Sequence, residues 1–317
     1  MIGFIVNPTA ANGKGAAVWR NVENLLKNRN IPYAVRFTEG PGQGAALAKQ
    51  LAADSAVTVV AAVGGDGTVH ETANGLLSSG AGKPLGYIPA GSGNDFARGH
   101  GIPADPAAAL DVLLSGSVRR IDVFRIGERF AVGSAGAGLD ASVALATNRA
   151  AHKNWLNRLK LGRVSYVLSL LSVLATYRTC GATIVVDGET REFGNVMFFT
   201  AANTPTYGGG MRICPDADPE DGEAAICVVS NIGKLELIRI FPSVYNGTHT
   251  KHPAVAILSG RRLEIRAERP LDIHMDGEAA GRTPFTLEVL PGALAIVAPP
   301  VAPQTGRDAE PGTPRGL

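Results

Sequence analysis

Two glycine-rich segments enclose acidic side chains, and each follows a short apolar run. The segment Gly64-Gly65-Asp66-Gly67-Thr68 comes after the run 57–63, and the segment 91–95, Gly-Ser-Gly-Asn-Asp, comes after the run 85–88. Glycine allows a backbone to approach a ligand closely, and the N–H groups of such loops bind phosphate. A carboxylate in that setting binds Mg²⁺ directly or through water. The two segments therefore predict a phosphate cleft, with Asp66 at the position for a divalent cation.

A second interpretation of Asp66 is a helix cap, because a helix is expected directly after it, over 68–78. The presence of a second glycine segment favours the cleft. Both segments would stand at the carboxyl ends of neighbouring parallel strands, where α/β sheets bind ligands. Each would also precede a helix, and helix N-termini attract phosphate.

The first part of the chain alternates strand-like and helix-like segments. We expect strands at 2–6, 33–37, 57–63 and 85–88, and helices at 16–27, 43–53, 68–78, 95–99 and 106–114. This alternation predicts a parallel sheet with right-handed crossovers. The run 57–63 is apolar throughout, which is typical of a buried central strand.

The pattern changes near residue 121. Strands are expected at 121–126, 129–134, 183–186, 195–201, 225–229, 262–266, 271–274, 286–290 and 294–298, and helices at 139–147, 155–177 and 234–245. Many short strands separated by turns are typical of a β-sandwich. We therefore predict an α/β domain over 1–121, a β-sandwich domain over 122–299, and a proline-rich disordered tail over 300–317.

The composition limits the function classes. The chain has 317 residues, 45% hydrophobic and 18% charged, with a net charge of +2. That charge does not favour a nucleic-acid partner. The three cysteines have no metal-binding or CxxC spacing, which favours reduced thiols and a cytoplasmic location. No signal peptide is expected at residues 1–6, and the apolar stretch 164–177 falls short of the about 20 residues of a membrane span.

The motifs resemble a known enzyme family. Residues 64–68, followed by Glu71 and Asn74-Gly75, and then Pro89–Arg98 with the sequence PAGSGNDFAR, are similar to the catalytic domain of the diacylglycerol kinase and sphingosine kinase superfamily, in its bacterial lipid-kinase branch. The Gly-Gly-Asp-Gly element is shared with NAD kinases and 6-phosphofructokinases, whereas the Asn-Asp-Phe-Ala-Arg element favours lipid kinases. The resemblance extends from Asn7 to Glu278. It implies a Rossmann-like nucleotide-binding domain followed by a β-sandwich, with the active site between them.

The same resemblance implies the nucleotide-binding residues. They are Asn7, Pro8, Thr9, Ala10, Ala11, Thr38, Gly64, Gly65, Asp66, Gly67, Thr68, Val69, His70, Glu71, Ser92, Asn94 and Asp95. Two positions depart from the family. Ser92 replaces the usual threonine but keeps a hydroxyl. In the first loop, which follows the expected strand 2–6 and spans residues 7–15, the expected glycine is shifted to Gly13. From the residues alone, this first loop is either a phosphate-binding loop or a connecting turn, and it is not a Walker A loop.

The acids after residue 200 have two interpretations each. Asp276-Gly277 is a strong hairpin-turn signal, while the resemblance makes Glu278 the proton acceptor, with Asp276 as its partner or as the base itself, and Asp66 as the organiser of the catalytic Mg²⁺.

An acidic loop is interpreted either as an exposed turn or, by resemblance, as a structural Mg²⁺ site. Its residues are Asp218, Asp221 and Glu223, with Asp122 in a carboxylate–water network near the metal.

Together these features predict an ATP-dependent and Mg²⁺-dependent lipid kinase. The expected acceptor is a lipid hydroxyl, first of all that of diacylglycerol, and a glycine-rich loop with Asn203, Tyr207 and Met211 would border its pocket. The alternatives are a soluble-acceptor kinase similar to NAD kinases and a non-catalytic nucleotide- or lipid-binding regulator. The basic segment 152–163, which contains Trp155, favours peripheral binding to an anionic membrane at its inner face, or else a solvated helix face. A homodimer through an edge strand is also expected.

Overall fold

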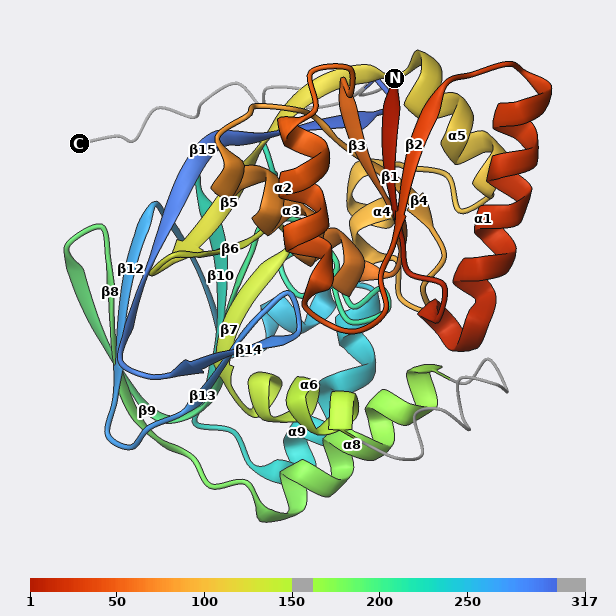
Figure 1. Ribbon diagram of the computed structural model, residues 1–317. Helices are drawn as coiled ribbons and strands as arrows, with labels where there is room; N and C mark the ends of the chain where they lie inside the picture. Colours follow the sequence, from red (N-terminus) through yellow and green to blue (C-terminus); the bar gives the residue numbers. More distant parts are fainter. Residues whose placement is uncertain (150–161, 301–317) are drawn as a thin grey trace, which may run out of the picture.

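The computed structural model describes residues 1–149 and 162–300 (Figure 1). The predicted membrane-binding segment 152–163 and the predicted disordered tail 300–317 lie outside this range except for residues 162, 163 and 300. In Figure 1 a helix-covered parallel sheet forms the upper right of the molecule, and a strand-rich part with three helices beneath it forms the rest. An α/β region thus precedes a mainly β region, as the sequence pattern indicates.

The first region is built on four parallel strands in the order β2-β1-β3-β4. They are β1 (Ile2–Val6), β2 (Tyr33–Phe37), β3 (Val59–Gly64) and β4 (Leu85–Pro89). The helices are α1 (Ala10–Asn28), α2 (Gln43–Ala53), α3 (Asp66–Ser79), α4 (Asp95–His100) and α5 (Pro106–Ser115). Helix α1 packs against α5, and α2 packs against α3. The chain leaves β1 in one direction along the sheet and reaches β3 on its other side, so the switch point of this sheet lies between β1 and β3.

Helices α2 and α3 touch at glycines. A methyl group on Gly75, in the middle of α3, would lie 2.3 Å from the Ala45 carbonyl oxygen and 2.7 Å from the Ala48 Cβ atom. In a helix interior, glycine lowers the stability of the helix by about 1 kcal/mol relative to alanine. Its presence here is explained by the close approach of α2, which leaves no room for a side chain.

Within the described residues, the second region consists of antiparallel strands and three α-helices. The strands are β5 (Ser117–Ile126), β6 (Arg129–Ala131), β7 (Ser134–Gly138), β8 (Cys180–Val186), β9 (Glu189–Ala202), β10 (Ala224–Ser230), β11 (Val255–Gly260), β12 (Arg262–Ala267), β13 (Asp272–Met275), β14 (Glu278–Arg282) and β15 (Phe285–Ala298). Their path runs β14-β13-β7-β9-β8-β12-β15, and β10 joins β9 to β11. Helices α6 (Leu139–Arg149), α8 (Gly162–Thr176) and α9 (Lys234–Ile240) cover a separate apolar cluster.

Strands β7, β11 and β14 differ from the sequence expectations. β7 starts where the expected strand 129–134 ends, and no strand was expected over β11 or β14. The sequence of β11 does not alternate polar and apolar residues, and β14 contains alanine and glycine. Neither segment therefore has a strong local strand signal. Within the described residues β11 pairs with β10 alone, and a homodimer through this edge stays a prediction.

The last strand joins the two regions. Strand β15 pairs with β5 along its length, and Ile296 pairs with Leu85 of β4 (Figure 1). The expectation of two strands, 286–290 and 294–298, is corrected to one strand with an irregular register between Leu290 and Leu294. Residues 294 and 296–298 pack in the hydrophobic core of the α/β region. The domain boundary expected at residue 121 falls inside β5. The α/β region is therefore completed by the end of the described chain.

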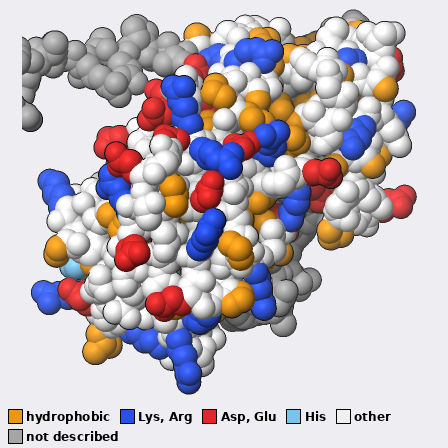
Figure 2. All heavy atoms as spheres, turned by 90° about the vertical axis from the view of Figure 1, so that its left-hand side faces the viewer, with side chains coloured by type: hydrophobic (Ala, Val, Ile, Leu, Met, Phe, Trp, Pro, Cys, Tyr) orange, Lys and Arg blue, Asp and Glu red, His pale blue; other side chains and the backbone are white. Residues whose placement is uncertain are grey.

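One broad face of the second region carries charges of both signs. Figure 2 shows lysine, arginine, aspartate and glutamate side chains intermixed over it. Glu288 of β15 pairs with Arg125 of β5 and with Arg262 of β12, and Arg191 pairs with Glu189. Such a surface is compatible with water and does not concentrate one sign of charge.

Candidate active site

The two glycine segments lie against each other at the carboxyl edge of the parallel sheet. The Ala90 N–H donates to the Gly64 carbonyl oxygen at 2.7 Å. A methyl group on Gly91 would lie only 2.5 Å from the Gly65 Cα atom. The loops after β3 and β4 are therefore packed backbone on backbone, and a side chain at Gly91 would push them apart. Asn94, in a left-handed conformation, closes the second loop by accepting from the Gly91 N–H at 2.9 Å.

Asp66 is the first residue of α3 and faces a second carboxylate. Its Oδ1 atom accepts from the Phe96 N–H at 3.0 Å. A methyl group on Gly93 would lie 2.9 Å from Asp66 Oδ2 and 3.3 Å from Asp95 Oδ2, so both carboxylates border the same glycine. Burial, and then the charge of Asp95, raise the pKa of Asp66 to about 6. Two acids with this oxygen donor set fit Mg²⁺, which takes carboxylate oxygens and water.

Asp95 also connects the two regions. Its carboxylate accepts from the N–H groups of Gly209 at 2.7 Å and Gly210 at 3.0 Å, and it pairs with Arg98. Both glycines have positive φ angles, 84° and 98°, which other residues rarely adopt. The glycine-rich loop of the second region is thereby held against the second glycine segment of the first.

The loop after β1 has an unusual backbone. Ala11, Asn12 and Gly13 have φ angles of 46°, 59° and 94°, so the regular part of α1 begins after them. Asn7 Oδ1 accepts from the Thr9 N–H at 3.1 Å, and Asn7 Nδ2 donates to the Thr68 hydroxyl at 3.4 Å. The first loop therefore adjoins the start of α3. Pro8 and Ala10 lie in this loop, partly exposed, and Thr38 follows β2 at the same edge of the sheet, with its N–H donating to Val6.

Three side chains of α3 point away from the glycine segments. Val69 is buried in the hydrophobic core of the α/β region. The Glu71 carboxylate accepts from the N–H groups of Gly42 and Gly44, both at 2.7 Å, and so caps the start of α2. His70 bonds to Asp276. Contacts between these three residues and a nucleotide would have to use their backbone, whereas Ser92 is exposed at the edge of the second glycine segment.

Asp276 lies in the turn between β13 and β14, as the Asp-Gly signal predicts. Asp276 and Gly277 have φ angles of 50° and 85°. The Asp276 carboxylate, with a side chain only 8% exposed, accepts from the N–H groups of Val132, Gly133 and Ser134 at 2.8–2.9 Å. It also bonds to His70 Nδ1 at 2.9 Å. Burial alone would raise the pKa of Asp276, but these donors and the His70 ring hold it below its ordinary value.

Glu278 has a different environment from Asp276. It is exposed at the start of β14. A methyl group on Gly67 would lie 3.7 Å from Glu278 Oε1, so this carboxylate stands over the loop that contains Asp66. The turn thus has one acid engaged by four donors and one acid that faces the glycine segments across the boundary between the two regions.

The acids of the loop 216–223 are engaged individually. Asp218 Oδ1 accepts from the Glu220 N–H at 3.0 Å, Asp221 Oδ1 from the Glu223 N–H at 2.9 Å, and Glu223 Oε2 from the Ser259 hydroxyl at 2.6 Å. Asp122 is buried and accepts from Gly222 and Gly292. Among the described residues no group of three or more His, Cys, Asp or Glu side chains gathers as a metal site.

Asp221 nevertheless has the surroundings of a cation ligand. Burial, and then the charges of Asp218, Asp122 and Glu223, raise its pKa, although the Glu223 N–H acts in the opposite sense. Glu220 of this loop pairs with Arg119 at 3.1 Å, whereas the charges that act on Asp221 are those of Asp218, Asp122 and Glu223. An all-oxygen donor set of this kind fits Mg²⁺ with one carboxylate, backbone oxygens and water.

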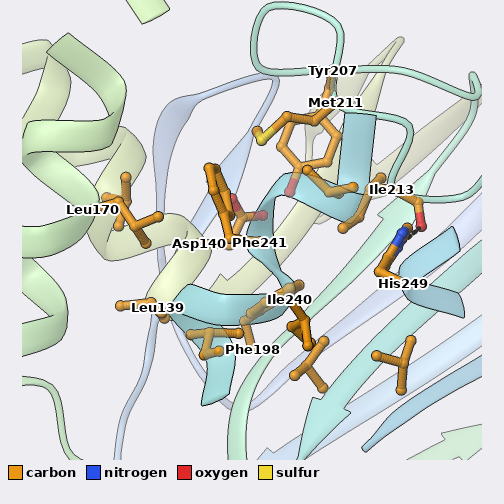
Figure 3. A pocket seen from close by; sticks show the side chains of 15 residues that line it. Leu139, Asp140, Leu170, Phe198, Tyr207, Met211, Ile213, Ile240, Phe241 and His249 are labelled. Atoms are coloured by element: carbon orange, nitrogen blue, oxygen red, sulfur yellow. Dashed lines mark hydrogen bonds between the residues drawn. The ribbon is translucent and has the colours of Figure 1, made fainter. Parts of the chain in front are cut away.

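An apolar cavity lies next to the glycine-rich loop of the second region. It holds about 60 Å³ of free space and is partly open to solvent. Figure 3 shows side chains from α6, α8, α9 and β9 that point toward its centre, with Tyr207 and Met211 at one end. Of the residues expected to border an acceptor pocket, Tyr207 and Met211 line this cavity. Asn203 does not: its Nδ2 atom donates to the carbonyls of Asp122 and Val132.

The structure identifies three side chains that sequence reasoning passed over. Asn74 exchanges two hydrogen bonds with the Phe130 backbone at 2.8 and 3.0 Å, which ties α3 to β6. His274 and Asp140 form a buried pair at 2.9 Å. His274 lies in β13, two residues before Asp276 of the following turn, and this spacing was the available signal. No helix of the described residues is long and apolar enough to cross a membrane.

Comparison with known proteins gives the family. Residues 1–126 match the family model described as the diacylglycerol kinase catalytic domain, and residues 133–298 match the one described as the YegS C-terminal NAD kinase beta sandwich-like domain. YtlR of Bacillus subtilis, named as a candidate lipid kinase, is 31% identical, covering 92% of this chain and 98% of its own. A diacylglycerol kinase of Mycobacterium tuberculosis is 29% identical, covering 93% and 94%.

A solved structure agrees with these matches. The crystal structure of a diacylglycerol kinase from Bacillus anthracis superposes with a TM-score of 0.75 at 24% identity, covering 94% of this chain and 97% of that one. This likeness confirms the predicted fold, an α/β domain followed by a β-sandwich-like domain. The chain therefore belongs to the diacylglycerol kinase family and is a lipid kinase that uses ATP as its phosphoryl donor.

Proposed function

We propose that this kinase transfers the γ-phosphoryl group of ATP to the free hydroxyl of diacylglycerol, with Glu278 accepting the hydroxyl proton. The observation that carries this proposal is the exposed Glu278 carboxylate, which stands over Gly67 from the second region. Relatives from Mycobacterium tuberculosis and Staphylococcus aureus named diacylglycerol kinase support this choice of acceptor. In phosphoryl transfer the protein mainly positions the groups and stabilises charge.

The two acids of the turn have separate roles in this proposal. Asp276 already accepts from three N–H groups and bonds to His70, so it has little capacity left for a substrate proton. Among the described residues the Glu278 side chain makes no hydrogen bond or ion pair, and it faces the glycine segments. Asp276 therefore fixes the turn, and Glu278 accepts the proton as the lipid oxygen attacks.

The glycine segments hold the nucleotide phosphates. Backbone N–H groups at Gly65–Gly67, at the first loop and at Ser92 are the donors, and the N-terminus of α3 favours negative charge there. Asp66, with Asp95 beside it, holds the catalytic Mg²⁺. The bound ion supplies positive charge to the β- and γ-phosphates.

The apolar cavity accommodates an acyl chain of the acceptor. Its lining is almost entirely aliphatic and aromatic, which matches a hydrocarbon chain and not a nucleotide or sugar. The loop 207–211 lies between this cavity and Asp95. A lipid with its chain in the cavity would present its polar end toward the glycine segments.

A second Mg²⁺ is bound by the acidic loop, with Asp221 as its carboxylate ligand and Asp218 and Glu223 contributing through backbone oxygen. The raised pKa of Asp221 supports this site, since a cation there would relieve the repulsion among the neighbouring acids. The role of this ion is structural, because the Gly222 N–H ties the loop that leads into β10 to Asp122 of β5.

The enzyme reaches its substrate by docking the α8 and α9 face on a membrane. Leu168 and Leu171 of α8 and Leu235 and Ile238 of α9 are exposed, Leu235 by 84%. Leu170 and Leu237, next to them on the same helices, line the cavity. Lys234 links the helices through the Ala175 carbonyl, and Arg239 is exposed beside Ile238. Exposed leucines flanked by basic residues suit an anionic bilayer surface, unlike the mixed face of Figure 2.

Replacing Glu278 tests the proton acceptor. A general base contributes about 10²–10⁴ in rate, so we expect Glu278→Gln to lower kcat on diacylglycerol micelles by about that factor while KM for ATP changes little. Its melting temperature should equal that of the wild type because the side chain is exposed. Asp276→Asn should instead lower the melting temperature. Glu192→Gln, an exposed acid of β9, is the control, and wild-type kcat in Glu278→Gln would refute the assignment.

Asp66 should limit the stability of the metal-free protein. Its pKa, raised to about 6 from an ordinary 3.8, means that ionisation destabilises the fold. This cost is absent below about pH 4, grows between about pH 4 and pH 6, and is constant above about pH 6. Asp66→Asn keeps the acceptor for the Phe96 N–H, so in EDTA we expect it to be more stable than wild type at pH 7 by about 1–2 kcal/mol, yet inactive. Denaturant titrations from pH 4 to 8 measure this, and a pH-independent difference would contradict it.

The structural metal predicts a dependence of stability on Mg²⁺. Without ATP, millimolar Mg²⁺ should raise the melting temperature of the wild type and of Asp66→Asn, because a ligand that binds only the folded state stabilises it. The same addition should leave Asp221→Ala unchanged. Thermal scans with and without Mg²⁺ provide the measurement. An equal shift in Asp221→Ala and wild type would show that the ion binds elsewhere.

Introducing negative charge on α9 should impair membrane docking without affecting phosphoryl transfer. We expect the pair Leu235→Glu and Ile238→Glu to weaken sedimentation with anionic phospholipid vesicles by about tenfold or more, since buried leucine contributes about 1.5–3 kcal/mol. Turnover of a short-chain, monomeric diacylglycerol should be unchanged. Leu114→Glu, on exposed α5 of the other region, is the matched control. Undiminished vesicle binding of the α9 pair would exclude this face.

A further inference from the structure

His274 makes contacts in two directions from the middle of the second region. It is buried, with 1% of its surface exposed, in β13. The Gly277 N–H donates to its Nδ1 atom at 3.3 Å. Because Nδ1 accepts, the ring proton is on Nε2, which lies 2.9 Å from Asp140 Oδ2 and donates to it. One imidazole thus joins the turn that carries Glu278 to the first turn of α6.

Asp140 is a fixed anchor for this ring. Its Oδ2 atom also accepts from the Thr200 hydroxyl at 2.7 Å, and Tyr207 bonds to the same carboxylate. Gly136 has no side chain and so leaves room for the His274 ring. A methyl group on Gly136 would lie 3.0 Å from His274 Nε2 and 2.6 Å from the Phe199 carbonyl oxygen. A buried polar group that is fully bonded in this way is rigid.

Asp140 and Tyr207 also line the apolar cavity (Figure 3). The ring of Tyr207 is centred 6.4 Å from that of His274. The bonds therefore run without interruption from the cavity wall, through Asp140 and His274, to the backbone of Gly277, whose next residue is Glu278.

We propose that His274 is a positioning residue that sets the place of Glu278 and couples it to the wall of the acceptor cavity. This inference rests on the proposed role of Glu278 as the proton acceptor. The side chain of Glu278 is exposed and stands over Gly67, so its position depends on the backbone of the turn. Asp276 holds one end of that turn, and His274 holds the peptide between Asp276 and Glu278. A displacement of about 1 Å in such a group can cost up to about a hundredfold in rate.

Two substitutions separate the two contacts of the ring. In His274→Gln the amide nitrogen can take the place of Nε2 and donate to Asp140, but the Gly277 N–H loses its acceptor. In His274→Asn the amide oxygen can take the place of Nδ1 and accept from Gly277, but the donor to Asp140 is lost. We expect His274→Gln to lower kcat about tenfold or more with KM for ATP unchanged. We expect His274→Asn to keep kcat within about threefold and to raise KM for diacylglycerol. His252→Gln, on the surface, is the control.

A double-mutant cycle with Glu278→Gln distinguishes positioning from a general structural role. If His274 acts through Glu278, adding His274→Gln to Glu278→Gln lowers kcat by less than about twofold further, while melting curves confirm that each variant is folded. A full multiplication of the two losses would overturn the inference and leave the base assignment intact. Wild-type kcat in His274→Gln would also overturn it. Wild-type kcat in Glu278→Gln alone would instead refute the proposed function, and with it the role given to His274.

Discussion

The carboxylate of Asp276 is the contact on which the two-region site depends. It is surrounded by three backbone N–H groups from the segment between β6 and β7 and by the His70 ring from α3. A buried carboxylate without such donors would be strongly disfavoured. The contact therefore requires that the β13–β14 turn, the β6–β7 segment and α3 meet at one place. Glu278, two residues further along, is placed over Gly67 as a consequence.

Two further contacts reinforce the same alignment of the regions. Asn74 binds the backbone of Phe130 from the middle of α3, and Asp95 binds the N–H groups of Gly209 and Gly210 from the start of α4. Asn74 and Asp95 each use a side chain to satisfy backbone groups of the other region, whereas Asp276 satisfies backbone groups of its own region and meets the first region through the His70 ring. Backbone groups do not change with mutation, so the register between the regions is specified by few side chains. The glycine-rich loop has a part in both halves of the site, because Asp95 holds its backbone while Tyr207 and Met211 line the cavity.

The phosphate side of the site is less stable than the core around it. Asp66 and Asp95 face the same glycine, and the ionised form of Asp66 is disfavoured until positive charge arrives. The glycine segments also forgo side-chain packing so that two loops can lie backbone on backbone. Sites that bind charge commonly hold groups in arrangements that are unfavourable without the ligand. The antiparallel region, with its satisfied carboxylates and apolar cavity, has the opposite character.

The sequence by itself determined the order of elements and the identity of the phosphate loops. Strand and helix periodicities are local properties, so β1, β2, α2, β3 and β4 were expected within about two residues of their bounds, and the motif from Gly64 to Arg98 was sufficient to indicate a lipid kinase. Tertiary structure decided which acid of the 276–278 turn is engaged, because both acids have the same local signal and differ only in their distant partners. It also decided that Glu71 caps α2 and that His274 meets Asp140, 134 residues away. A hydrogen bond has no signature in either residue until the fold brings donor and acceptor together, and for this reason the site's positioning groups could be identified only from the structure.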